Sequence, residues 1–81
     1  MTYRLKYDAE ADAVHDSLPQ PVSQELSLRL AAACDDPLGE TAPFGEPDDV
    51  MRRVITPHVV AVLLLGHAGK TITVLRIRPL R

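Results

Sequence analysis

The stretch that decides the fold is Val59–Arg78, VVAVLLLGHAGKTITVLRIR. It begins with the unbroken apolar run 59–65, which is typical of a central strand covered on both faces. The GHAG segment at 66–69 predicts a turn, and the β-branched residues after it predict a last strand that ends before Pro79. The stretch therefore predicts a β-hairpin whose first strand is central in a sheet.

The N-terminal half predicts one strand and two helices. Residues 2–7 alternate in polarity, so Arg4 and Lys6 share the exposed side of a half-buried strand. Asp8 is placed to cap the first helix, and Pro19 and Pro21 separate it from the second. The apolar stripes expected on the two helices are Ala9, Ala13, Val14 and Leu18, then Val22, Leu26, Leu30 and Ala33.

The segment 35–49 predicts a long surface loop, because it contains three prolines, two glycines and six acidic residues. Phe44, the one phenylalanine, is expected to pin this loop to the body. Residues 50–56 then predict a further strand. The order β-α-α-β-β-β predicts an α+β fold, with a helical hairpin packed on one face of a small, mainly antiparallel twisted sheet.

Length and cysteine content bound the class of protein. A chain of 81 residues predicts one domain over 1–81 with a small core. Cys34 is the sole cysteine, so it cannot form an internal disulfide, and it is expected to be a small buried residue. We expect a cytoplasmic protein that neither crosses a membrane nor is secreted, with no metal and no cofactor.

The net charge of −2 conceals two opposite poles. Residues 1–49 contain eleven acidic and three basic residues, a balance of −8. Residues 50–81 contain six basic residues and no acidic one, a balance of +6. Such a separation predicts an anionic partner for one of the poles.

Alternation in the last strand predicts where its arginines lie. One set of side chains is expected to pack on the helices, and the other to share the opposite face with Arg4 and Lys6. The helix-facing set is Thr73, Leu75 and Ile77, and the opposite set is Ile72, Val74, Arg76 and Arg78. Arg52 and Arg53 point to opposite faces of their strand, so one of them is expected to be an ordinary surface charge.

Three segments together resemble the RelE/ParE toxin superfamily of bacterial toxin–antitoxin systems. YRLKYDAEADAVHDSLP is similar to the opening strand and helix of that family, LRLAAACDDPLG to the end of its second helix, and MRRVITPHVVAVLLLGHAGKTITVLRIRPLR to its three-stranded meander. The chain departs from the family where a tyrosine and an arginine are common, because His58 and Val59 stand there, and its end carries no tyrosine.

The resemblance implies a metal-independent endoribonuclease that cleaves mRNA on the ribosome, inhibits translation and arrests growth until its antitoxin binds. A toxin–antitoxin hetero-oligomer is expected. Guanidiniums suit the extra negative charge of the pentavalent phosphate, and a histidine can move the proton. The expected catalytic residues are Arg53, His58, Arg76 and Arg78. The expected nucleic-acid-binding residues are Arg4, Lys6, Arg52, Lys70 and Arg81.

Other functions fit the same residues. The ParE branch of the family implies inhibition of DNA gyrase, and a catalytically decayed domain would only bind its antitoxin. Arg76 and Arg78 are alternatively edge-strand charges that prevent aggregation. His58 and His67 are alternatively polar turn residues.

Overall fold

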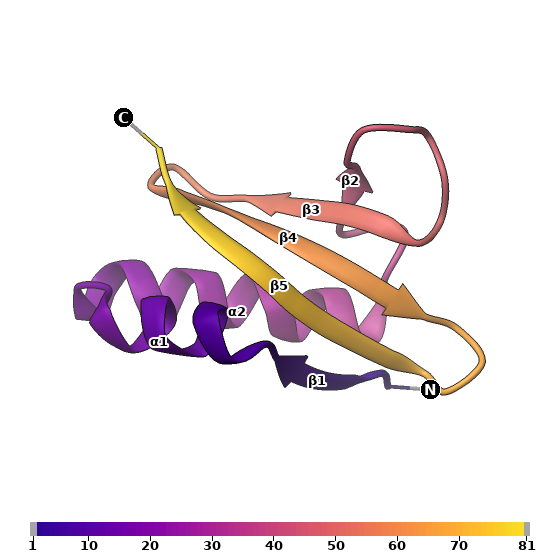
Figure 1. The fold of residues 1–81 in the computed structure, drawn as a ribbon, viewed down its shortest axis with the longest axis horizontal. Helices are drawn as coiled ribbons and strands as arrows, with labels where there is room; N and C mark the ends of the chain where they lie inside the picture. The colour runs from indigo at the N-terminus through magenta and orange to yellow at the C-terminus, as the bar shows by residue number, and fades with distance from the viewer. Residues whose placement is uncertain (1, 81) are drawn as a thin grey trace.

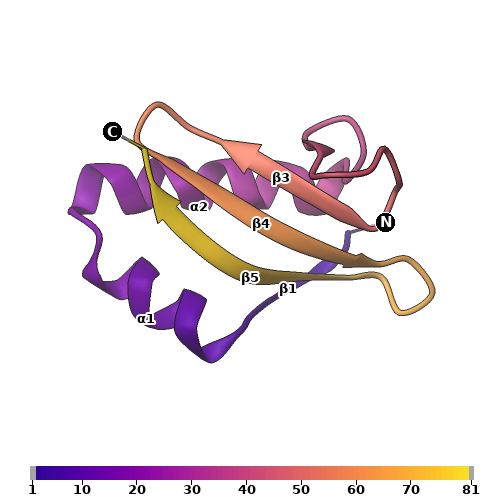
Figure 2. The same ribbon diagram turned by 45° about the horizontal axis from the view of Figure 1, so that its top comes forward.

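The structure is a computed structural model that describes residues 2–80. Two helices lie on one face of a five-stranded sheet (Figure 1, Figure 2). The elements are β1 (Arg4–Tyr7), α1 (Ala9–Ser17), α2 (Gln20–Asp35), β2 (Ala42–Pro43), β3 (Met51–Ile55), β4 (Val59–Gly66) and β5 (Thr71–Pro79). The expected α+β architecture and element order are confirmed, with the addition of the short strand β2. No helix in the described part of the chain is long and apolar enough to span a membrane.

The predicted hairpin forms the centre of the sheet. The strand order is β1-β5-β4-β3-β2, in which β1 runs parallel to β5 and every other pair is antiparallel. The helical hairpin carries the chain from β1 to the far edge of the sheet (Figure 1). The antiparallel strands then return from that edge, so the last strand, β5, pairs with β1. β1 pairs only with Thr71–Val74, so the following half of β5 has a free edge among residues 2–80.

The helices begin and end near the predicted positions. α1 ends at Ser17 before Pro19, and Pro21 lies in the first turn of α2, where its missing N–H costs no hydrogen bond. Asp8 precedes α1 in an extended conformation but makes no side-chain capping bond, so the predicted cap is wrong in that respect. Ala9 and Ala13 are exposed, because the buried side of α1 is formed by Ala11 with the half-buried Val14 and Leu18.

The core lies between the helices and the sheet. Its fully buried large side chains are Leu26, Leu30, Val54, Val59, Leu63, Ile72 and Val74. The stripe expected on α2 is therefore confirmed. The apolar run of β4 is not covered by helices on both faces, however, since Leu64 remains 38% exposed on the far side. We call this helix-free side of the sheet the open face.

A β-bulge in β5 changes which residues face the core. Leu63 pairs with Val74 while its neighbour Val62 pairs with Arg76, so Leu75 is an additional residue with no partner. The sequence predicted Ile72 and Val74 on the face opposite the helices. This prediction is wrong, because both are buried against the helices. The predicted alternation is right beyond the bulge, where Ile77 is buried.

Candidate functional site

Three arginines share the open face at the centre of the sheet. The strand register places Arg53, Val62 and Arg76 in one row across β3, β4 and β5. Arg78 follows two residues beyond Arg76, opposite Val60. With strands about 4.8 Å apart and about 3.4 Å per residue, the three stems form a triangle with sides of about 7 to 12 Å. We call Arg53, Arg76 and Arg78 the arginine triangle.

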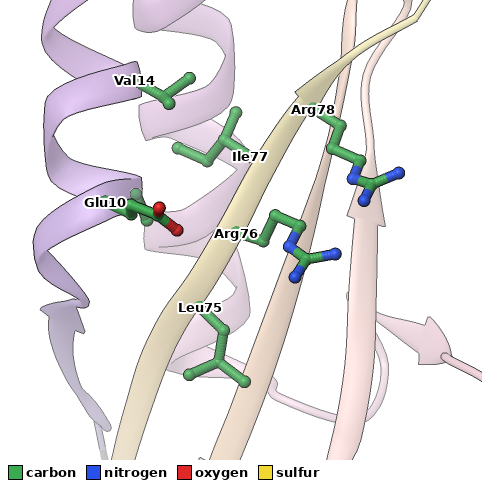
Figure 3. A pocket seen from close by; sticks show the side chains of 7 residues that line it. Glu10, Val14, Leu75, Arg76, Ile77 and Arg78 are labelled. Atoms are coloured by element: carbon green, nitrogen blue, oxygen red, sulfur yellow. The ribbon is translucent and has the colours of Figure 1, made fainter.

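The arginine triangle is exposed to solvent. Figure 3 shows the guanidiniums of Arg76 and Arg78 extending from β5 over the neighbouring strands, whereas Ile77 points towards α1. Within residues 2–80, the guanidiniums that form hydrogen bonds with protein atoms are those of Arg29 and Arg52. The triangle can therefore direct its donors at an anion, and paired guanidinium forks bind phosphate oxygens well.

Two further cations extend the open face along β1. Arg4 lies opposite Thr71 and Lys6 opposite Thr73, and both are exposed. Leu5 pairs with the buried Ile72, so the alternating basic residues face away from the helices. As predicted, the cations of β1 lie on the same face of the sheet as Arg76 and Arg78 of β5.

Lys70 lies at the opposite end of β5 from Arg78. It occupies the turn after β4 in a left-handed conformation with φ of 55°. Its Nζ lies 5.6 Å from the centroid of the Tyr3 ring, which is a cation–π distance. The structure does not bring Lys70 into the arginine triangle. Arg81, also predicted as a binding residue, lies outside the described residues.

Arg52 does not lie on the open face. Its side chain is only 8% exposed and points to the helix side of β3, like Val54. Its Nε donates to Thr41 Oγ1 at 2.9 Å, and its Nη1 donates to the Asp48 carbonyl at 3.0 Å. Nη2 donates to the carbonyls of Leu38 and Thr41 at 3.2 and 2.9 Å. The predictions of Arg52 as a surface charge and as a nucleic-acid-binding residue are therefore wrong. Its hydrogen bonds instead hold the segment 35–49, which we call the acidic loop.

His58 lies in the turn between β3 and β4. The Thr56 hydroxyl accepts hydrogen bonds from the backbone N–H groups of His58 and Val59 at 3.2 and 3.0 Å, which fixes this turn. The carbonyl of His58 accepts the N–H of Leu80 at 2.8 Å, which places the turn beside the end of β5. His58 is exposed and lies at the Arg78 end of the triangle.

A small hollow borders the arginine triangle, and the sequence did not indicate it. Its volume is about 200 Å³, and Phe44, Met51, Val62, Leu75 and Arg76 line it. Phe44 is 42% exposed, although it was expected to be an anchor of the loop. Its backbone N–H donates to the Met51 carbonyl at 3.1 Å. We call this feature the aromatic hollow.

The sequence also missed a histidine that ties three segments together. His67 Nδ1 lies 2.7 Å from the hydroxyl of Tyr3, and its Nε2 lies 2.6 Å from the carbonyl of Asp49. His67 thus connects the turn after β4 to the residue before β1 and to the end of the acidic loop. His67 lies in the predicted turn, and the contacts of its ring are what the sequence did not indicate.

Cys34 lies on α2, on the helix side of the sheet and away from the open face (Figure 1). Cys34 is buried as expected, and its burial, with a contribution from Asp35, raises the pKa of its thiol. No group of three His, Cys, Asp or Glu side chains in the described part of the chain is arranged to bind a metal ion.

Comparisons with known proteins identify the fold. No family model matches the sequence, and no curated protein matches it. Among solved structures, the chain is similar to one from a RelBE toxin–antitoxin complex of Mycobacterium tuberculosis, with a TM-score of 0.82, 13% identity and coverage of 99% of this chain and 100% of that one. A chain of the intact Escherichia coli RelBE complex matches with a TM-score of 0.82 and 17% identity, and the match covers 98% of both chains. A chain of an archaeal RelE–RelB complex from Pyrococcus horikoshii matches with a TM-score of 0.77 and 16% identity, and the match covers 98% of this chain and 96% of that one. The chain therefore has the RelE toxin fold.

Proposed function

We propose that this protein is the toxin of a type II toxin–antitoxin system and that it cleaves mRNA on the ribosome. The observation that carries the proposal is the arginine triangle, which projects from the open face of a RelE fold. The similar solved structures are toxin–antitoxin complexes, which supports an antitoxin as the physiological partner. In this proposal the protein acts in the cytoplasm and arrests growth until the antitoxin binds it in a hetero-oligomer.

The proposed reaction uses the RNA as its own nucleophile. The ribose 2′-oxygen attacks the adjacent phosphorus, the bond from phosphorus to the 5′-oxygen breaks, and a 2′,3′-cyclic phosphate and a 5′-hydroxyl form. The 2′-hydroxyl loses one proton and the leaving 5′-oxygen gains one, so the reaction consumes no cofactor. Negative charge on the phosphate oxygens increases in the pentavalent state, and donors placed there accelerate the reaction.

The triangle supplies the stabilisation of that charge. Arg53 and Arg76 approach the phosphate from two strands on either side of Val62, and Arg78 approaches from along β5. The strand ladder fixes the backbone positions of the three arginines, and their exposed side chains direct their donors at the phosphate. We assign proton transfer to His58, since an imidazole changes its charge near neutral pH. Arg4 and Lys6 then contact the flanking RNA backbone from β1.

The proposal is tested by expressing the protein without an antitoxin and mapping the 5′ ends of cellular mRNA. New 5′ ends at ribosome-occupied positions are expected, together with slowed growth. Arg76→Ala and Arg78→Ala should each lower the cleavage rate about 100-fold or more while the fold persists. Arg29→Ala is the matched control, because its guanidinium binds the Ile55 carbonyl from α2 instead of joining the triangle.

Two results would contradict the nuclease. Intact mRNA together with trapped gyrase–DNA breaks would indicate a ParE-like activity. Full toxicity of the double variant at Arg76 and Arg78 would assign these residues to protection of the free edge of β5.

A further inference from the structure

We infer that Phe44 and the aromatic hollow form a subsite that stacks one nucleobase of the RNA bound by the arginine triangle. The inference rests on the proposed function and adds a residue for positioning the substrate. Arg76 belongs to both features, since it lines the hollow and is one corner of the triangle. A ligand that occupies both sites must combine an apolar plane with an anionic group, as a nucleotide does.

The chemistry of the hollow fits a base better than a charged or fully polar group. Phe44 lines it together with the apolar residues Met51, Val62 and Leu75, and Arg76 is its one charged lining residue. Aromatic rings and guanidinium planes are the groups on which proteins stack unpaired bases. Phe44 is the only phenylalanine of the chain, yet 42% of its surface remains exposed. The open ring is thus available to a ligand.

The structure holds Phe44 in place before any ligand binds. Four hydrogen bonds from Arg52 fasten the loop at Leu38, Thr41 and Asp48, on both sides of Phe44 in the chain. The Phe44 N–H binds the Met51 carbonyl directly. An aromatic side chain on a fastened loop loses little conformational entropy on binding, so stacking contributes more of its energy to affinity.

The spacing also suits a single nucleotide and its neighbouring phosphate. Met51, in the hollow, and Arg53, in the triangle, are two residues apart on β3, a distance of about 7 Å. The hollow and the triangle therefore lie side by side on the open face, with Arg76 between them. Charge complementarity favours RNA as the occupant over an apolar peptide segment, because the three guanidiniums beside the hollow make no hydrogen bond to protein atoms within residues 2–80.

The test replaces Phe44 with side chains of similar volume that either keep or lack an aromatic ring. Phe44→Leu keeps an apolar residue and removes the ring, whereas Phe44→Tyr keeps the ring. Single-turnover cleavage on ribosomes that carry a defined mRNA should fall about 10-fold in Phe44→Leu, within the range measured for loss of one stacked base. Phe44→Tyr should cleave within about twofold of the wild type. The thermal midpoints of both variants should match the wild type.

A second measurement does not depend on cleavage. The chain contains no tryptophan, so Phe44→Trp introduces a single indole fluorophore at the hollow. A single-stranded RNA trinucleotide should quench its fluorescence through stacking. The same trinucleotide with an abasic central position, and inorganic phosphate, should bind the arginines and leave the fluorescence nearly unchanged.

The outcomes separate the subsite from the proposed function. If the wild type cleaves mRNA and Phe44→Leu cleaves equally fast, the subsite is wrong and the nuclease stands. If the wild type does not cleave but the trinucleotide alone quenches the indole, the nuclease is wrong and the base-binding subsite stands. Equal quenching by the intact and abasic RNAs would overturn the subsite. So would a Phe44→Leu variant whose only defect is weaker binding of an antitoxin.

Discussion

Replacement of Arg52 is the most direct test of how this small domain holds its acidic loop. Arg52 is only 8% exposed, and its guanidinium makes four hydrogen bonds, three of them to backbone carbonyls. Arg52→Ala removes every one of these donors and leaves the carbonyls of Leu38, Thr41 and Asp48 without this partner. Water can reach some of them near the surface, so the loss is smaller than the sum of the bonds.

The expected cost follows from the number and kind of the bonds. A hydrogen bond from a charged donor contributes about 1.5 to 3 kcal/mol, and losses in one network are not additive. We therefore expect Arg52→Ala to lower the free energy of unfolding by about 3 kcal/mol. For a domain of this size, each kcal/mol changes the thermal midpoint by about 4 to 8 °C, so the midpoint should fall by about 15 °C.

Urea and thermal unfolding followed by circular dichroism measure this loss. Arg53→Ala is the matched control, because it removes the adjacent arginine of the same strand from the exposed face and should change stability by at most about 0.5 kcal/mol. Arg52→Lys should lie between the two, since one ammonium reaches fewer of the carbonyls than the guanidinium fork. Limited proteolysis should cut Arg52→Ala within residues 38–48. Equal stability and equal protease resistance in both alanine variants would refute the structural role of Arg52.

Three further predictions concern the charged and titratable groups. The affinity for single-stranded RNA should fall with a slope of about −2 in log K against log salt if the open face neutralises three phosphates, one at the triangle and one each at Arg4 and Lys6, and Lys6→Ala should reduce the slope by about 0.7; a flat salt dependence would contradict the electrostatic face. Burial raises the pKa of Cys34 above its ordinary value of 9.0, so iodoacetamide at pH 8 should modify it at least about 10-fold more slowly than free cysteine until denaturant is added. Hydrogen bonds from the Met51 and Val50 N–H groups, with a smaller contribution from Arg52, lower the pKa of Asp48 from 3.8. Because its folded-state pKa is depressed, Asp48 stabilises the fold above pH 3.8 and loses this effect as the pH falls through the folded value. The stability advantage of the wild type over Asp48→Asn should therefore shrink below about pH 4, and a constant difference between pH 7 and 2 would contradict the assignment.

The main elements could be predicted because local signals mark them. The spacing of apolar residues changes at the same places where Pro19, Pro21 and the GHAG segment interrupt the chain. The helices and the central hairpin were therefore placed correctly. β2 was missed because a two-residue strand has no period, and only its pairing with Arg52 and Arg53 defines it. The bulge at Leu75 was missed for a similar reason: it exists in the register between β4 and β5, and no glycine in β5 marks it.

The candidate site was predictable in its charge but not in its geometry. The +6 balance of residues 50–81 indicated which part of the chain carries the candidate anion site. Alternation separated Arg52 from Arg53 but could not say which one was buried, because both faces of β3 carry apolar side chains. The row from Arg53 to Arg76 depends on register across two strand pairs, and the exposure of Phe44 depends on a loop that a distant arginine holds. These are long-range properties with no local sequence pattern.

The two parts of the open face have different mechanical properties, and this difference divides their proposed roles. The backbone of the triangle is fixed by the β3–β4–β5 ladder, but its guanidiniums lie at the ends of long, exposed side chains. Such groups adapt to a phosphate wherever the RNA backbone places it, so they contribute affinity and charge stabilisation without choosing a register. Phe44 has only two rotatable side-chain bonds and sits on a fastened loop, so it accepts a base in a narrow range of positions. Loss of a triangle arginine should therefore lower the cleavage rate by a similar factor at every site. Loss of the Phe44 ring should lower the rate and also spread the cuts over neighbouring positions of the mRNA.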